Sequence, residues 1–223
     1  MIIMMMDHMH KHLEYKNNRI IIYRMKVLEL FAGTGSVGNI AKEMGFDVVS
    51  LDRDMEADIK TDIMDWDYTF YPNKYFDVIW ASPPCTEYSC AKTTAPRDIE
   101  GANLVVQRTL DILEHFEPKY WIIENPQTGL LKDQLCMWGL PFKDVDYCKY
   151  GMPYRKRTRI WNNVFKWEPR PLCKKDCWAI DETGRKHKCI AQRVATKTYK
   201  NSSFKQSELY MAPSELIKEI FLN

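Results

Sequence analysis

A cysteine that directly follows two prolines is the residue of this sequence best placed to do chemistry. Pro83 and Pro84 follow the apolar segment YFDVIWAS and restrict the backbone, so they fix the position of Cys85 at the end of a predicted strand. A thiolate in polar, partly exposed surroundings is a reactive nucleophile. The structural alternative is that Cys85 packs as a small buried hydrophobic residue, as unpaired cysteines commonly do.

A carboxyl group stands at the end of another apolar segment. Glu124 closes the run YWIIE, and Asn125 and Pro126 stiffen the backbone that leaves it. If both strands belong to one parallel sheet, Glu124 and Cys85 lie at the same edge, where a carboxyl group can donate a proton to a substrate. The alternative role for Glu124 is that of a structural residue in a salt bridge.

A glycine-rich loop suggests a nucleotide-like cofactor. In LFAGTGSVG, glycines at 33, 35 and 38 let the backbone pass close to a ligand at the start of a predicted helix. Asp52 ends the next predicted strand, where an acid can hold ribose hydroxyls, and Asp62 follows where a third strand would end. The loop has no Walker lysine, which disfavours phosphoryl transfer. The alternative is a tight turn beside a surface acid.

An alternation of strands and helices positions these groups. The apolar pattern predicts strands at residues 27–31, 47–52, 75–82 and 120–125, and helices at residues 37–44 and 103–117. This order is typical of an α/β, Rossmann-like fold, in which helices cover both faces of a mostly parallel sheet. Ligands of such sheets bind at the carboxyl ends of the strands, where the thiol, the carboxyl group and the glycine loop are expected.

The pattern weakens beyond Pro141. A strand or hairpin is predicted over residues 150–167, and APSELIKEIF near the end is a predicted helix. We therefore expect one catalytic domain with short appendages: a flexible extension at 1–24, the catalytic domain at 25–165, a reduced segment at 166–205, and a C-terminal helical part at 206–223 that packs back on the catalytic domain.

The reduced segment contains a possible metal site. CKKDCWAIDETGRKHKC places Cys173, Cys177, His187 and Cys189 at spacings that can bind one structural zinc ion. Three thiolates and one imidazole make a closed tetrahedral site, and a metal is the usual way to order so small a segment. The alternative is a set of reduced surface cysteines in a basic loop.

Composition narrows the class of protein. Seven cysteines, an odd number without an export signal, favour reduced thiols, a metal site or catalysis over disulfides, and so an intracellular, cytoplasmic protein. The apolar run IIIY is too short to span a membrane. Residues 143–205 hold 17 Lys and Arg against 6 Asp and Glu, a balance that suits a polyanion such as nucleic acid. The alternative is a solvated, lysine-rich surface.

Four motifs, in this order, resemble those of the cytosine-5 DNA methyltransferase family: FAGTGSVG, SPPCTEYS, ENP and YGMPYRKRTRIW. The resemblance covers roughly residues 26–161 and extends to the compact members of phages and large viruses. It implies that Cys85 is the nucleophile, Glu124 the catalytic glutamate, and Arg157 with Arg159 the paired arginines that support the nucleophile and the target base. It also implies S-adenosylmethionine as cofactor, bound by Phe31, Ala32, Gly33, Thr34, Gly35, Ser36, Gly38 and Pro84, with Asp52 on the ribose and Asp62 near the adenine.

The implied reaction is methylation of carbon 5 of cytosine in DNA through a covalent Cys85 adduct. Carbon 5 is a poor nucleophile, so a thiolate that adds at carbon 6 while an acid engages N3 makes an enamine that can take a methyl group. A base inside a duplex cannot reach such a pocket, so the target cytosine must flip out. We expect a monomer with DNA as partner, no membrane contact, and a setting such as restriction–modification.

The sequence departs from the family at three points. Arg155 stands where members usually carry a glutamine, the asparagine motif expected before the last helix is not visible, and only about forty residues are available for target recognition. A separate partner that supplies specificity is therefore an alternative to recognition by this chain alone. RNA cytosine methylation and a catalytically silent nucleic-acid-binding module are the other functions left open.

Overall fold

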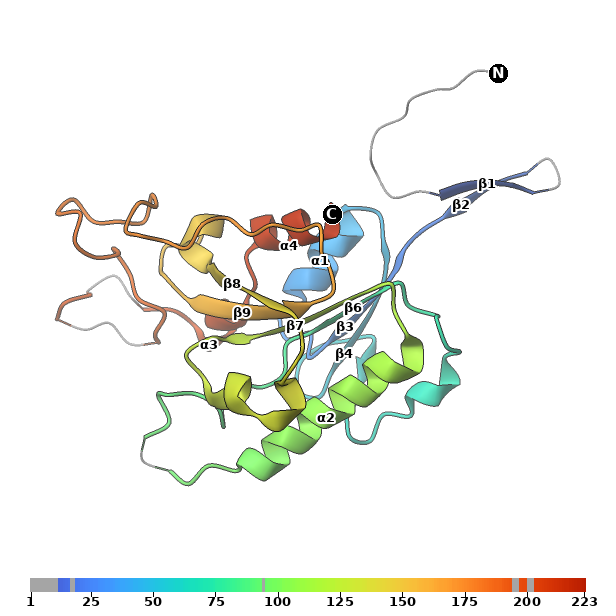
Figure 1. Ribbon diagram of the computed structural model, residues 1–223, viewed down its shortest axis with the longest axis horizontal. Helices are drawn as coiled ribbons and strands as arrows, with labels where there is room; N and C mark the ends of the chain where they lie inside the picture. The colour runs from blue at the N-terminus through green and yellow to red at the C-terminus, as the bar shows by residue number, and fades with distance from the viewer. Residues whose placement is uncertain (1–11, 17–18, 94, 194–196, 200–202) are drawn as a thin grey trace, which may run out of the picture.

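The computed structural model describes residues 12–16, 19–93, 95–193, 197–199 and 203–223 (Figure 1). A seven-stranded sheet forms its centre, in the order β5-β4-β3-β6-β7-β9-β8. Its strands are β3 (Lys26–Leu30), β4 (Asp47–Asp52), β5 (Ile59–Lys60), β6 (Val78–Ala81), β7 (Tyr120–Pro126), β8 (Phe142–Asp146) and β9 (Arg157–Asn162). Strands β3 to β7 run parallel, whereas β9 is antiparallel to both β7 and β8. The predicted mostly parallel sheet is therefore confirmed.

Helices cover both faces of this sheet, with α1 and α4 on one face and α2 on the other (Figure 1). The described helices are α1 (Ser36–Glu43), α2 (Ile99–Phe116), α3 (Gln206–Tyr210) and α4 (Ser214–Phe221), with short 3-10 turns η1 (Tyr68–Phe70), η2 (Leu130–Asp133), η3 (Leu135–Met137) and η4 (Tyr147–Tyr150). None of these helices combines the length and apolar character that crossing a membrane requires.

Alternate residues of the central strands supply two cores. Val27 of β3 packs with α1 and α4, whereas Leu28 and Leu30 pack on the α2 side. Successive side chains of a strand point to opposite faces, so a strand buried on both faces has a continuous apolar sequence. Because helices cover both faces of the sheet, a ligand can reach it at the loops that follow the ends of its strands.

Several elements differ from the sequence prediction. Helix α2 begins at Ile99 rather than residue 103, because the Asp98 side chain accepts a hydrogen bond from Gly101 N (2.8 Å) and caps its first turn. Strand β8 was missed because FKDVD is largely polar. Within the predicted extension, β1 (His12–Lys16) and β2 (Arg19–Tyr23) form an antiparallel hairpin, and residues 1–11 lie outside the described part.

The C-terminal part contains two helices rather than one. Helix α4 packs on α1, and the rings of Phe221 and Phe46 lie 5.7 Å apart in an edge-to-face contact. The shorter α3 lies at the mouth of the pocket described below. Between β9 and α3, the described residues form no helix or strand, although isolated bridges such as Ile180 to His187 occur there.

Candidate active site

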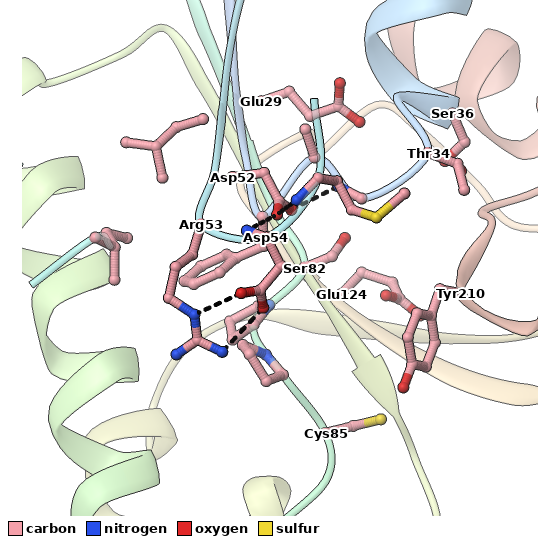
Figure 2. Close-up of a pocket in the computed structure, with 18 of the residues that line it drawn as sticks. Glu29, Thr34, Ser36, Asp52, Arg53, Asp54, Ser82, Cys85, Glu124 and Tyr210 are labelled. Atoms are coloured by element: carbon pink, nitrogen blue, oxygen red, sulfur yellow. Dashed lines mark hydrogen bonds and ion pairs between the residues drawn. The ribbon is translucent and has the colours of Figure 1, made fainter. Parts of the chain in front are cut away.

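A pocket of about 580 Å³ opens at the carboxyl ends of β3, β4, β6 and β7 (Figure 2). This size is within the range of about 300–1,000 Å³ typical of small-molecule and cofactor sites. Figure 2 shows Ser36 of α1 at one side and Cys85 at the other, with Glu124 and Tyr210 between them. The pocket thus brings the glycine loop, the thiol and the carboxyl group to one place.

The glycine loop after β3 has an unusual backbone. Gly33 and Gly35 have φ angles of 54° and 68°, in the left-handed region that glycine adopts without cost, and Phe31 adopts a φ of 59° despite its side chain. Gly38 lacks a side chain for another reason, since a Cβ there would lie 2.6 Å from Glu29 Oε2. The loop therefore exposes backbone toward the pocket at the start of α1.

Glu29 in β3 is a pocket residue that the sequence prediction missed. It is almost fully buried, and its carboxylate accepts hydrogen bonds from Val37 N (3.1 Å) and Gly38 N (2.9 Å). It thereby caps α1, whose N-cap residue Gly35 has no side chain to do so. Burial raises the pKa of Glu29 to about 7, although the two backbone hydrogen bonds oppose the shift. The available signal was an acid inside the apolar run KVLEL.

The predicted cofactor acids border the same pocket. Asp52 Oδ2 accepts from Gly33 N (2.8 Å), and Asp52 Oδ1 accepts from the backbone N of Asp54 and of Met55, each at 2.8 Å. Asp62 lies 3.4 Å from Arg53 Nη1. The predicted cofactor residues that line the pocket are Phe31, Ala32, Gly33, Thr34, Ser36, Asp52, Asp62 and Pro84; Gly35 and Gly38 are not among its lining residues.

Cys85 and Glu124 both line the pocket, at the ends of β6 and β7. Asn125 Nδ2 donates to Pro83 O (2.9 Å), which ties the proline segment to β7 and so fixes the backbone before the thiol. The buried Tyr147 hydroxyl donates to Glu124 Oε1 (2.8 Å). Burial raises the pKa of the Cys85 thiol, the Lys156 charge lowers it, and the Glu124 carboxylate raises it, so that the pKa lies above its usual value.

Two arginines predicted to support the thiol are directed elsewhere. Arg157 Nε and Nη2 bond the Asp146 carboxylate at 3.0 and 2.7 Å, and Arg159 bonds Asp144 at 2.8 and 3.0 Å. Both are cross-strand pairs of the β8–β9 hairpin. Neither arginine is among the pocket-lining residues, whereas Lys156 is. In this structure both arginines bind β8, and their support of the nucleophile and the target base stays a prediction.

A second cluster lies beside the turn η4. The ligand atoms of Cys148, Cys173, Cys177 and His187 all lie within 4.8 Å of one another. Three of these four were predicted as metal ligands, but Cys148 takes the place expected for Cys189, which instead forms a backbone bridge with Tyr154. Spacing along the chain could not reveal Cys148, because the turn that carries it meets the segment only through the tertiary fold.

The sheet order and the helices on both of its faces define an α/β, Rossmann-like fold. Entamoeba histolytica methyltransferase EhMeth has the same fold, with a TM-score of 0.51 and 16% identity over 67% of this chain. This chain spans 56% of that protein's length.

The chain belongs to the family of C-5 cytosine-specific DNA methylases, whose family model matches residues 25–136. A protein of Frog virus 3 (isolate Goorha), named as a probable DNA (cytosine-5)-methyltransferase, is 36% identical over 168 residues, which cover 68% of this chain and 77% of that protein. The resemblance carried by the four sequence motifs is thereby confirmed.

Proposed function

We propose that this chain carries out the reaction of its family on DNA, methyl transfer to carbon 5 of cytosine, with Cys85 as the covalent nucleophile. The observation that carries the proposal is the shared pocket: Cys85 and Glu124 line it together with the glycine loop at the start of α1. S-adenosylmethionine, held by the loop with Asp52 and Asp62, supplies an electrophilic methyl group on its sulfonium sulfur. The pocket's volume and the backbone exposed by the loop suit such a nucleoside cofactor.

The chain's own residues perform the activation of the base. The Cys85 thiolate forms a bond to carbon 6 while Glu124 gives a proton to N3, so the electrons of the C5–C6 double bond become available at carbon 5. After carbon 5 carries the methyl group, its proton leaves to a base, the thiolate departs from carbon 6 and the N3 proton returns to Glu124, which restores the aromatic ring. Because Cys85 lies in a pocket, the proposal includes a flipped target cytosine.

Labelled methyl transfer to mixed-sequence duplex DNA tests this proposal, beside transfer RNA and a Cys85→Ala control, with the product nucleoside identified. We expect 5-methylcytosine in DNA only when the thiol is present. Product in RNA alone would replace DNA as the substrate, and equal transfer by Cys85→Ala would overturn the thiol mechanism. Cofactor binding without transfer to either polymer would favour a silent binding module or a missing specificity partner.

We also propose one structural zinc ion at Cys148, Cys173, Cys177 and His187. His187 Nε2 lies 3.5 Å from Cys173 Sγ and 3.4 Å from Cys177 Sγ. A tetrahedral zinc site places sulfur and nitrogen ligands about 3.6 Å apart, so the atoms are already close to that geometry. Such a site would order the short segment after β9. We propose that this segment contributes to target recognition, and that the protein acts as a monomer inside the cell. None of the seven cysteines forms a disulfide bond.

Two matched variants separate the ligand sets. Cys148→Ser is expected to lose the metal and lower the melting temperature, whereas Cys189→Ser retains about one zinc per chain. Elemental analysis of protein purified without added metal gives the zinc content. Zinc retained by Cys148→Ser but lost from Cys189→Ser would restore the set expected from sequence, and metal-free protein with an unchanged melting temperature in chelator would remove the site.

A further inference from the structure

Three successive cationic residues, Arg155, Lys156 and Arg157, lie just before and at the start of β9, and their side chains point alternately to opposite sides of the chain. Arg155 and Arg157 both bond the buried Asp146 carboxylate, on one side of the hairpin. Lys156 lies between them in the sequence, and successive residues of an extended chain point to opposite faces. Glu124 pairs with Ile160 across β7 and β9, so the even-numbered residues of this stretch share the face of Glu124. Lys156 is therefore the cation that faces the pocket.

Three groups from different elements hold the Lys156 side chain. Its Nζ lies 3.7 Å from Glu124 Oε1 of β7, donates to Leu209 O of α3 (3.1 Å), and lies 4.9 Å from the ring centre of Tyr147 in η4. Its side chain is only 16% exposed. Because the Lys156 side chain is largely buried, its charge interacts with the Glu124 carboxylate through a less polar medium than the charges of a surface ion pair do.

From this geometry we infer that Lys156 supplies the positive charge of the active site and stabilises the Cys85 thiolate. The inference rests on the proposed function, since it assigns a further residue to the same site. Lys156 thereby takes a role expected of the paired arginines, which the hairpin directs toward Asp144 and Asp146. It is a positioning and electrostatic residue rather than a donor or acceptor of the transferred group.

The surroundings of Cys85 make such a charge necessary. Burial and the Glu124 carboxylate both raise the pKa of the thiol, whereas the Lys156 charge and, after it, a backbone hydrogen bond lower it. The other ionisable groups that line the pocket are Glu29, Asp52, Arg53, Asp54, Asp62 and Tyr210. Arg53 is the other cation among them, and its guanidinium bonds Asp54 (Figure 2). Without Lys156, the charged groups around Cys85 would be mainly negative, and they would disfavour its thiolate.

Alkylation of Cys85 by iodoacetamide measures the thiolate directly, without DNA or cofactor. In this reaction the thiolate displaces iodide and the thiol proton passes to solvent, so the rate reports the thiolate fraction. The experiment uses a Cys90→Ser background, because the exposed Cys90 lies in the same peptide region. We expect Lys156→Met to slow alkylation of Cys85 about tenfold at neutral pH and to match the parent at high pH, while Lys156→Arg stays within about twofold.

Lys218→Met is the matched control, since it removes one exposed charge from α4 at a residue that does not line the pocket. A second variant, Glu124→Gln, removes the opposing charge and is expected to accelerate alkylation, and combined with Lys156→Met to return the rate toward the parent. This combination keeps the test decisive if Lys156→Met alone folds poorly. An unchanged pH profile in Lys156→Met, or equal slowing by Lys156→Arg, would overturn the inference.

The inference and the proposed function fail in different ways. Suppose that Lys156→Met slows alkylation of Cys85 as expected, but the parent protein transfers no methyl group to DNA. The charge assignment then holds and the proposed reaction is wrong. If methyl transfer requires Cys85 yet Lys156→Met changes neither kcat nor the alkylation profile, the reaction holds and the assignment to Lys156 falls.

Discussion

At the scale of single residues, the site balances buried acids against a small number of cations. Glu29 is the clearest case, because its carboxylate is buried under the glycine loop and yet accepts two backbone hydrogen bonds at the start of α1. Ionised, it caps the helix and suits the positive end of the helix dipole; protonated, it avoids the cost of a buried charge. Burial is the stronger effect, so the pKa of Glu29 is raised to about 7.

This raised pKa predicts a pH dependence of stability. The folded state holds the Glu29 proton more tightly than the unfolded state, so the contribution of Glu29 is full below its ordinary pKa of 4.5 and is lost as pH rises through about 7. The lost free energy of unfolding is on the order of 3 kcal/mol. We expect urea denaturation to show the parent losing stability relative to Glu29→Gln between pH 5 and pH 7. Parallel stability curves for the two proteins would contradict this prediction.

At the scale of elements, the β8–β9 hairpin depends on one buried carboxylate. Asp146 is fully buried and accepts hydrogen bonds from Arg155, Arg157 and Cys173 N (2.9 Å). Burial tends to raise the pKa of Asp146, but the bonds from Arg157 and from the Cys173 amide hold it below its usual range. Asp146 therefore joins the hairpin to the segment that carries Cys173, Cys177 and His187, and it directly precedes Tyr147, which bonds Glu124.

Removing this carboxylate is expected to destabilise the protein strongly. Asp146→Ala would leave the Arg157 guanidinium and the Cys173 amide without their partner, at a cost of about 3 kcal/mol. Asp144→Ala is the matched control, because its pair with Arg159 is partly exposed and should cost about 1 kcal/mol. Chemical denaturation of both variants measures the difference. Equal losses would show that Asp146 does not connect the two elements.

The elements also show what local sequence could and could not predict. Strand β4 was predicted at residues 47–52 and β7 nearly so, because each segment carries adjacent β-branched residues. Strand β8 was missed because its acids are matched by arginines of β9, a cross-strand pairing that no local pattern reveals. Cys85 and Glu124 were predicted as site residues because each stands at the end of an apolar segment of the sequence. Lys156 and Tyr147 were missed because they approach Glu124 only through tertiary contacts. The direction of Lys156 follows from the register of β9 on β7.

At the scale of the whole molecule, the basic charge of residues 143–205 is divided into two groups. Several of its cations are bound within the fold, among them Arg157, Arg159 and Arg170, which pair with acids. The exposed cations beside the Cys173–His187 cluster take part in no ion pair in the described part of the chain: Lys174, Lys175, Arg185 and Lys188. The second group can therefore contact phosphate without breaking a bond that stabilises the fold.

This division predicts which cations set the affinity for DNA. Each phosphate contact contributes about 0.9 to the slope of log affinity against log salt concentration on duplex DNA. Replacement of Lys174, Lys175, Arg185 and Lys188 by alanine should therefore reduce the slope by up to about 3.6, and leave kcat at saturating DNA close to that of the parent. Fluorescence anisotropy with a labelled duplex at several salt concentrations measures the slope, and zinc content confirms that the cluster is intact.

The control removes the same amount of charge outside residues 143–205, at Arg24, Lys74, Lys119 and Lys218, which are exposed. Net charge alone would weaken binding equally in both quadruple variants, because long-range attraction depends on total charge. Direct contact with phosphate would change the slope of log affinity against log salt concentration only for the variant that lacks Lys174, Lys175, Arg185 and Lys188. The comparison thus decides whether the short segment after β9 touches the DNA backbone or whether the duplex is held elsewhere on the molecule.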